Sequence, residues 1–338
     1  HQVYIATDES MYPGSVFRLQ HSYIHSANGG NNVKSRAERN EIYNNWIEDP
    51  MFHVLDLIGP DGQDPGLARE DSDVVGNVLI QRGDYWVARL GGDGTGATSG
   101  RYRFAYNTII LGSPSSAFFL QDSIESLAVH DNVFLAEGGS PQIYVDGDAS
   151  WVGGPQLSAE RNFVQAGLDA PGFFTGTVSG ADPMFVDMAG GNLVPLEASP
   201  LRDAGAAGAG PSGFEVPNAL AMPEFVPPAL GVSADLAPIP RPSDAAPDIG
   251  AYEFGTVITP GPGPEPTSSS SSGGGPGDDP FLPGDGAEDG NDLEGVACGC
   301  RVPGAETPAG RGGAAAGALA LIALAGFATR RRPRRTRR

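Results

Sequence analysis

Short apolar and polar runs alternate along the first 200 residues, and they recur at a loose period. The clearest mark of each repeat is an Asn followed directly by apolar or β-branched residues. Such runs begin at Asn45, Asn77, Asn107, Asn132 and Asn162. Their spacings of 25 to 32 residues are typical of stacked repeats, in which each repeat buries its apolar face against its neighbours.

Short β-prone runs lie between these Asn positions, and Gly, Asn and Asp turns separate them. One set of runs occupies an equivalent place in successive repeats, at residues 52–57, 85–90, 117–120 and 142–145. Few segments carry a helical apolar period longer than two turns, so the pattern predicts an all-β protein. The two-residue Asn-Gly and Asp-Gly turns of hairpins are rare, which favours equivalent strands stacked in parallel.

The recurring Asn fits a coiled chain, in which equivalent residues of successive coils lie above one another. We expect each Asn to stand at a corner in left-handed (αL) geometry and to bond the Asn of the next coil. A β-sandwich is the alternative, but it would show strands every 8–12 residues or so without the longer period. The sequence therefore predicts parallel β-helix coils over residues 1–205.

Two groups of residues resemble a known superfold. Residues 29–37, followed by residues 52–57, resemble right-handed parallel β-helix repeat proteins of the pectin-lyase-like kind. The C-terminal ends of such helices, common in exported and surface-anchored bacterial proteins, are similar to residues 181–187, 196–205 and 247–253. The resemblance implies a right-handed β-helix with an irregular closing segment over residues 206–255. It specifies no activity, since this superfold hosts many functions.

Charge and composition restrict the partners. The chain has a net charge of −20, and residues 1–300 alone carry 12 basic and 40 acidic residues. A body this acidic repels phosphate backbones, so we expect no nucleic-acid partner. Residues 256–297 are rich in Pro, Gly, Ser and acidic residues, which predicts a disordered linker.

Residues 298–338 have the pattern of an export tail. Cys298 and Cys300 precede an uncharged run over residues 312–329, which is followed by seven arginines. A run of about 18 apolar residues just suffices to span a bilayer, and the arginines would hold its end in the cytoplasm.

This tail resembles the C-terminal sorting signal of myxobacterial surface proteins. The resemblance implies processing near Cys298 or Cys300, a membrane contact through the tail, and export to the cell surface or outer membrane. A permanent membrane anchor is the alternative. An exported chain should also begin with a signal peptide. The sequence starts at His1 without one, so we expect it to begin inside a longer gene product.

The candidate catalytic residues are Lys34, Arg36, His53 and Asp56. Lys34 is the only lysine of the chain, and it shares one face of a predicted strand with Arg36 because alternate residues point the same way. His53 and Asp56 would lie on the following coil, about 4.8 Å away. Cations beside a base suit β-elimination of uronates, in which a proton α to a carboxylate is removed and the enediolate is stabilised.

Some β-helix polysaccharide lyases, such as alginate lyase and chondroitinase B relatives, are similar here because they carry a Lys-Ser motif on a comparable strand. The resemblance implies that Lys34 is the base and that a later arginine is the acid. Calcium is the candidate cofactor, with no residue assigned to it. The sequence departs from the pattern in two places: Gly-Gly-Asn-Asn replaces an expected acidic residue at 29–32, and residues 52–57 contain no arginine.

Two hypotheses therefore remain. In the first, the protein is a polysaccharide lyase-like enzyme that acts from the cell surface. In the second, it is a non-catalytic surface adhesin that binds glycans, and Lys34 and Arg36 pair with Asp56 or Glu38 in a surface ladder. The aromatic residues that could line a sugar groove are Trp46, Trp86, Trp151, Tyr85, Tyr102 and Tyr144, although burial inside the coils is the expected use of most of them.

Overall fold

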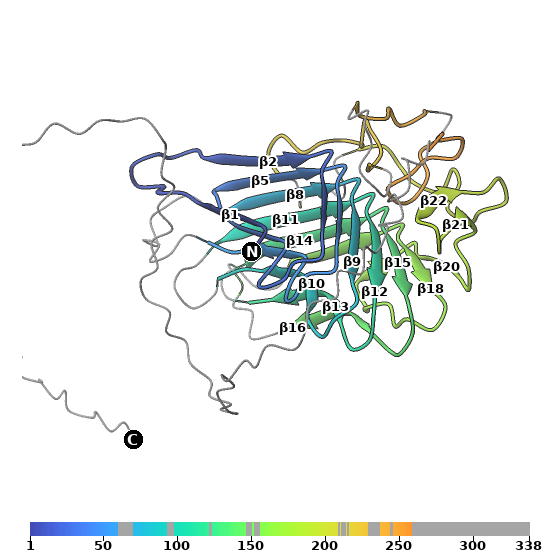
Figure 1. Cartoon of the computed structure of the whole chain (residues 1–338), viewed down its shortest axis with the longest axis horizontal. Helices are drawn as coiled ribbons and strands as arrows, with labels where there is room; N and C mark the ends of the chain where they lie inside the picture. The colour runs from blue at the N-terminus through green and yellow to red at the C-terminus, as the bar shows by residue number, and fades with distance from the viewer. Residues whose placement is uncertain are drawn as a thin grey trace, which may run out of the picture. The chain divides into compact units, whose positions relative to one another are not determined.

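The computed structural model describes residues 1–258 except 60–69, 93–97, 122–123, 147–150, 152–155, 209, 211–213, 215, 229–236 and 244–245. All regular elements in these residues are β-strands, and the strands form three parallel sheets and one antiparallel pair (Figure 1). The prediction of an all-β parallel β-helix is confirmed. The predicted tail over 298–338, with Cys298 and Cys300, and most of the predicted linker lie outside the described residues.

The chain visits the three sheets in turn, so that three successive strands make one coil. Sheet A contains β1 (Val3–Ala6), β4 (Val33–Arg36), β7 (Leu55–Leu57), β10 (Trp86–Leu90), β13 (Ser116–Leu120) and β16 (Gln142–Asp146). Sheet B contains β2 (Val16–Gln20), β5 (Arg39–Tyr43), β8 (Asp71–Val75), β11 (Gly100–Ala105), β14 (Ile124–His130), β17 (Leu157–Glu160) and β19 (Phe174–Thr175). Sheet C contains β3 (Tyr23–His25), β6 (Trp46–Glu48), β9 (Val78–Gln81), β12 (Thr108–Leu111), β15 (Val133–Ala136), β18 (Phe163–Gln165) and β20 (Val178–Gly180). The antiparallel pair is β21 (Phe185–Asp187) and β22 (Asn192–Pro195).

The runs predicted to be equivalent all lie in sheet A, as β7, β10, β13 and β16. The first of them is shorter than expected, because regular pairing begins only at Leu55. Inward side chains of the three sheets fill the coils. Phe104, Phe118 and Phe134 are fully buried, and Phe118 packs edge-on against the other two at ring-centroid distances of 4.8 and 6.1 Å.

The predicted Asn ladder forms at the corner between sheets B and C. The side-chain amide of each Asn donates to the side-chain oxygen of the next, at 2.9 Å for the first three steps and 3.0 Å for the last, along Asn45, Asn77, Asn107, Asn132 and Asn162. The predicted backbone geometry of these residues is wrong. The αL conformation belongs to the residue before each Asn, such as Asn44 with φ 56° and Tyr106 with φ 54°. The turn is made one residue earlier, and each Asn lies directly before the first residue of the next strand.

The chain after β20 covers the outer faces of two sheets. Leu201, Val226 and Tyr252 pack in one hydrophobic cluster with outward residues of sheet C such as Trp46. Leu220 and Met222 pack against outward residues of sheet B. Neither of these clusters contains a described residue of sheet A, so the described apolar packing of this segment is against sheets B and C. Among the described residues, no helix could cross a membrane.

Candidate functional site

Lys34, His53 and Asp56 come together on the outer face of sheet A. Lys34 in β4 is in register with Asp56 in β7, and its Nζ lies 3.9 Å from Asp56 Oδ2. Asn31 connects the other two, because its Nδ2 donates to Asp56 Oδ2 at 2.7 Å and its Oδ1 accepts from the His53 backbone N–H at 3.1 Å. The structure thus brings together three of the four residues chosen from the sequence.

Arg89 in β10 was missed by the sequence reasoning, and it completes this group. It is in register with Asp56, and its Nε and Nη2 donate to the two carboxylate oxygens at 2.6 and 3.0 Å. We call Lys34, Asp56 and Arg89 the charged row. The signal that could have found Arg89 is the equivalence of residues 52–57 and 85–90, which places this arginine two coils after Lys34 rather than one.

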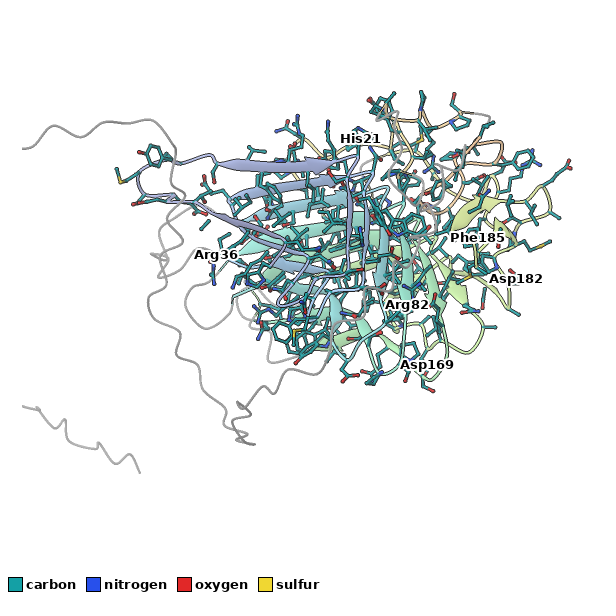
Figure 2. The ribbon with its side chains drawn as sticks, viewed as in Figure 1. His21, Arg36, Arg82, Asp169, Asp182 and Phe185 are labelled. Atoms are coloured by element: carbon teal, nitrogen blue, oxygen red, sulfur yellow. The ribbon has the colours of Figure 1, made fainter. Side chains whose placement is uncertain are left out.

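Arg36 does not join the charged row, which corrects the expectation that it shares an exposed face with Lys34. It is the last residue of β4, where the chain leaves sheet A, and it is buried. Its Nη1 donates to the backbone oxygen of Gly59 at 2.6 Å, at the left end of the strands in Figure 2. Glu38 is also occupied, since its carboxylate accepts from the backbone N–H groups of Gly14 and Ser15.

An aromatic strip borders the charged row on sheet A; it consists of Phe52, His53, Tyr85, Trp86 and Phe119. Trp86 stacks on Phe119 at a centroid distance of 3.7 Å and an interplanar angle of 4°. His53 stacks on the Trp86 ring at 4.9 Å and 11°. Phe52 and Tyr85 are 36% and 38% exposed at the edge of the strip. Phe119 is in register with Arg89, so the strip and the charged row form one surface.

The other aromatic residues considered from the sequence mostly serve the interior. Trp46 and Tyr102 are buried, and Tyr144 packs against Phe173 with ring centroids 5.5 Å apart. No group of three or more His, Cys, Asp or Glu side chains in the described residues is arranged to hold a metal ion. We therefore assign none of the described residues to the candidate calcium cofactor.

This chain matches no protein-family model, no curated protein and no solved structure. The function of the sheet A face is therefore inferred from its own side chains.

His53 is an uncharged member of the strip at neutral pH. The pKa of His53 is lowered from the usual 6.5 to about 4, mainly by burial; Asp56 opposes the shift, and Arg89 and Lys34 contribute to it. Below pH 6.5 the unfolded chain takes up this proton and the folded chain does not, so His53 reduces stability as the pH falls from 6.5 to about 4. A shift of this size corresponds to about 2–4 kcal/mol.

We expect His53→Gln to remove part of the acid sensitivity of the fold. The measurement is the midpoint of urea unfolding between pH 7.5 and 5 for the variant and the wild type. The change in the midpoint with pH is determined separately for each protein, because Glu9 also responds to pH. Burial raises the pKa of Glu9 to about 7, so Glu9 increases stability as the pH falls, whereas His53 reduces it. Substitution of the exposed His25 by Gln is the control. Identical pH slopes in the wild type and His53→Gln would show that His53 titrates normally.

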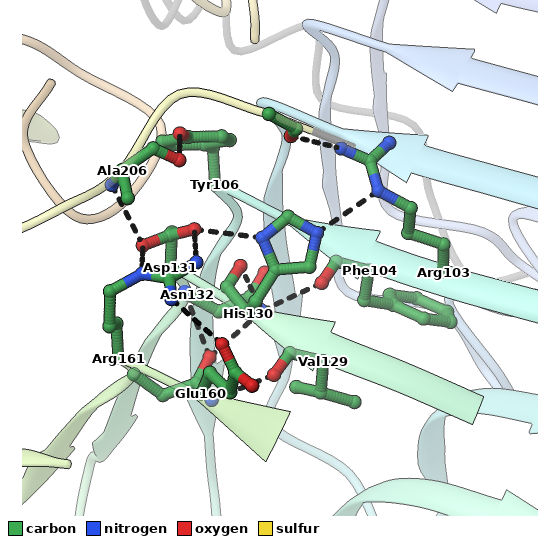
Figure 3. Close-up of polar contacts among 12 residues, drawn as sticks. Arg103, Phe104, Tyr106, Val129, His130, Asp131, Asn132, Glu160, Arg161 and Ala206 are labelled. Atoms are coloured by element: carbon green, nitrogen blue, oxygen red, sulfur yellow. Dashed lines mark hydrogen bonds and ion pairs between the residues drawn. The ribbon is translucent and has the colours of Figure 1, made fainter. Parts of the chain in front are cut away.

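A second polar cluster lies on the outer face of sheet B and is fully buried (Figure 3). Arg103 donates from Nη1 to Asp73 Oδ1 at 2.5 Å and from Nε to His130 Nε2 at 3.0 Å. Because Nε2 accepts, the His130 proton is assigned to Nδ1, which lies 2.7 Å from Asp131 Oδ2. Burial lowers the pKa of His130, which agrees with a neutral imidazole.

This cluster fastens the segment that covers sheet B. The backbone N–H of Leu220 donates to Asp73 at 2.8 Å, and its oxygen accepts from Arg103 Nη2 at 2.8 Å. The N–H of Ala206 donates to Asp131 at 3.3 Å. Since the side chains of Asp73, Arg103, His130 and Asp131 are fully buried and paired with other protein groups, we assign this cluster a structural role.

Proposed function

We propose that this protein is a cell-surface β-helix that binds polysaccharide on the outer face of sheet A. The observation that carries the proposal is the aromatic strip beside the charged row on the outer face of sheet A, where Phe52 and Tyr85 are partly exposed. The exposed rings of Phe52 and Tyr85 at the edge of the strip can pack against the apolar faces of sugar rings, and nearby side-chain donors orient the hydroxyl groups. The strip extends over three coils, each about 4.8 Å from the next, so it can contact more than one sugar.

Binding is better supported than elimination. A lyase base needs a lysine that is free to remove a proton, whereas Lys34 lies in an ion pair with Asp56. Arg89, the other positive side chain of the charged row, is held by both oxygens of the same carboxylate. The non-catalytic hypothesis is therefore the one we adopt, and uronate elimination by Lys34 remains an untested prediction. The surface location rests on the tail sequence with Cys298 and Cys300.

Trp86→Ala is expected to weaken glycan binding at least tenfold, because it removes the central ring of the strip. Binding is measured by isothermal titration calorimetry against a panel of soluble plant and bacterial polysaccharides. Tyr12→Ala is the matched control, since Tyr12 is 68% exposed on the loop between β1 and β2. If the wild type binds no polysaccharide, or if Trp86→Ala binds as the wild type does, the proposal fails.

The same polysaccharides test elimination. Unsaturated uronate products are followed by ultraviolet absorbance, with and without calcium, for the wild type and Lys34→Ala. We expect no product from either protein. Product formed by the wild type and lost in Lys34→Ala would replace the binding proposal with a lyase.

A further inference from the structure

Asp56 lies between Lys34 and Arg89, in the position where the carboxylate of a bound ligand would lie. Its side chain is 1% exposed, whereas those of Lys34 and Arg89 are 16% and 21% exposed. Both of its oxygens accept from Arg89, and Asn31 donates a further hydrogen bond. This two-pronged pairing is the geometry in which arginine usually holds a carboxylate, so the protein itself fills that position.

The charges of the row show what this pairing does to a ligand. Lys34 and Arg89 alone would present two positive charges on the glycan face, and the Asp56 carboxylate reduces that total to one. The chain as a whole is strongly acidic, with a net charge of −20, and its field repels polyanions. A uronate carboxylate that approaches the row would have to compete with a buried carboxylate that is already fully paired.

We propose that Asp56 sets the specificity of the sheet A face for neutral glycans over polyuronates, by occupying the carboxylate position between Lys34 and Arg89. This inference rests on the proposed function. The outward parts of the lysine and arginine then serve as donors to hydroxyl oxygens, while the exposed rings of Phe52 and Tyr85 supply apolar contacts. The ligand class is thus a neutral polysaccharide, and not the acidic one that Lys34 and Arg36 predicted from the sequence.

The test compares one polymer in two charge states: a soluble polyuronate and the same polymer after chemical reduction of its carboxyl groups. We expect the wild type to bind the reduced, neutral polymer at least threefold more tightly. Asp56→Asn keeps the size of the side chain but removes its charge, so the ratio of the two affinities should shift at least tenfold towards the polyuronate. The gained polyuronate binding should weaken with added salt, because it is electrostatic.

Asp169→Asn is the charge-matched control, because Asp169 is exposed and lies away from Arg36, the last residue of β4, in Figure 2; its affinity ratio should equal that of the wild type. If the wild type binds the polyuronate more tightly than the reduced polymer, the inference is contradicted but the proposed function is not. This comparison uses only the wild type, so it holds even if Asp56→Asn does not fold. A folded Asp56→Asn with an unchanged ratio also overturns it. If the wild type binds neither polymer nor any other glycan, the proposed function is contradicted and the inference falls with it.

Discussion

Replacement of Arg103 by Met is expected to lower the free energy of unfolding by about 3–5 kcal/mol. Arg103 and Asp73 form an ion pair whose two side chains are fully buried. Loss of the guanidinium leaves the Asp73 carboxylate in the interior without its paired cation, and it also removes the donors to His130 and to the Leu220 backbone oxygen. Urea unfolding followed by circular dichroism measures the change.

The closing segment should loosen in the same variant. Hydrogen exchange is expected to rise at residues 206–208 and 216–222, which the cluster fastens to sheet B. Arg18→Met is the matched control because Arg18 lies in the same outward line of sheet B, two coils before Asp73. Its side chain is 59% exposed, so the loss of its ion pair should cost less than about 1 kcal/mol. Equal costs for the two substitutions would mean that the Arg103 cluster is open to water.

Asn107→Ala is expected to lower the free energy of unfolding by about 2–4 kcal/mol. The Asn107 amide donates to Asn132 and to the Val74 backbone oxygen, both at 2.9 Å. Its side-chain oxygen accepts from the backbone N–H and the side-chain amide of Asn77, also at 2.9 Å. Alanine supplies none of these partners, and the small cavity that it leaves lies in the middle of the ladder.

A second variant of Asn107 keeps its side-chain acceptor for Asn77 and removes its side-chain donors. Asn107→Asp keeps an oxygen for Asn77 but turns a second oxygen towards the Val74 and Asn132 oxygens, so we expect it to be at least as destabilising as alanine at neutral pH. Asn28, which is exposed, provides the control, and its substitution by Ala should change stability by less than about 0.5 kcal/mol. A cost below about 1 kcal/mol for Asn107→Ala would show that the ladder contributes little to stability.

The fold was predictable because the positions that repeat in each coil accept only a few residue types. The Asn at each corner must satisfy neighbours above and below, and the apolar runs of each coil must face inward, so both recur along the sequence. The αL position was wrong by one residue because the side-chain ladder and the backbone turn are separate requirements. Asn44, Gly76, Tyr106, Asp131 and Arg161 all satisfy the turn, so no single residue type marks it.

The candidate site was predictable only in part, because residues of adjacent coils meet through register. Lys34 and Asp56 were paired correctly since their strands are neighbours. Arg89 was missed because its place beside Asp56 depends on the lengths of the intervening loops, which the apolar pattern does not fix. Leu220 and Met222, which cover sheet B, carry no periodic signal at all, since the closing segment follows no regular secondary structure.

The closing segment also determines how the β-helix would bear a mechanical load. Neighbouring coils are joined by backbone hydrogen bonds and the Asn ladder, both directed along the helix axis, so a pull along that axis acts on them directly. The segment contacts Arg39 through the Asn218 oxygen at 3.3 Å and Asp131 through Ala206, three coils apart. Leu220 also bonds to Asp73 and Arg103 on the coils between these points, so separation of the four coils has to break side contacts as well as the bonds along the axis.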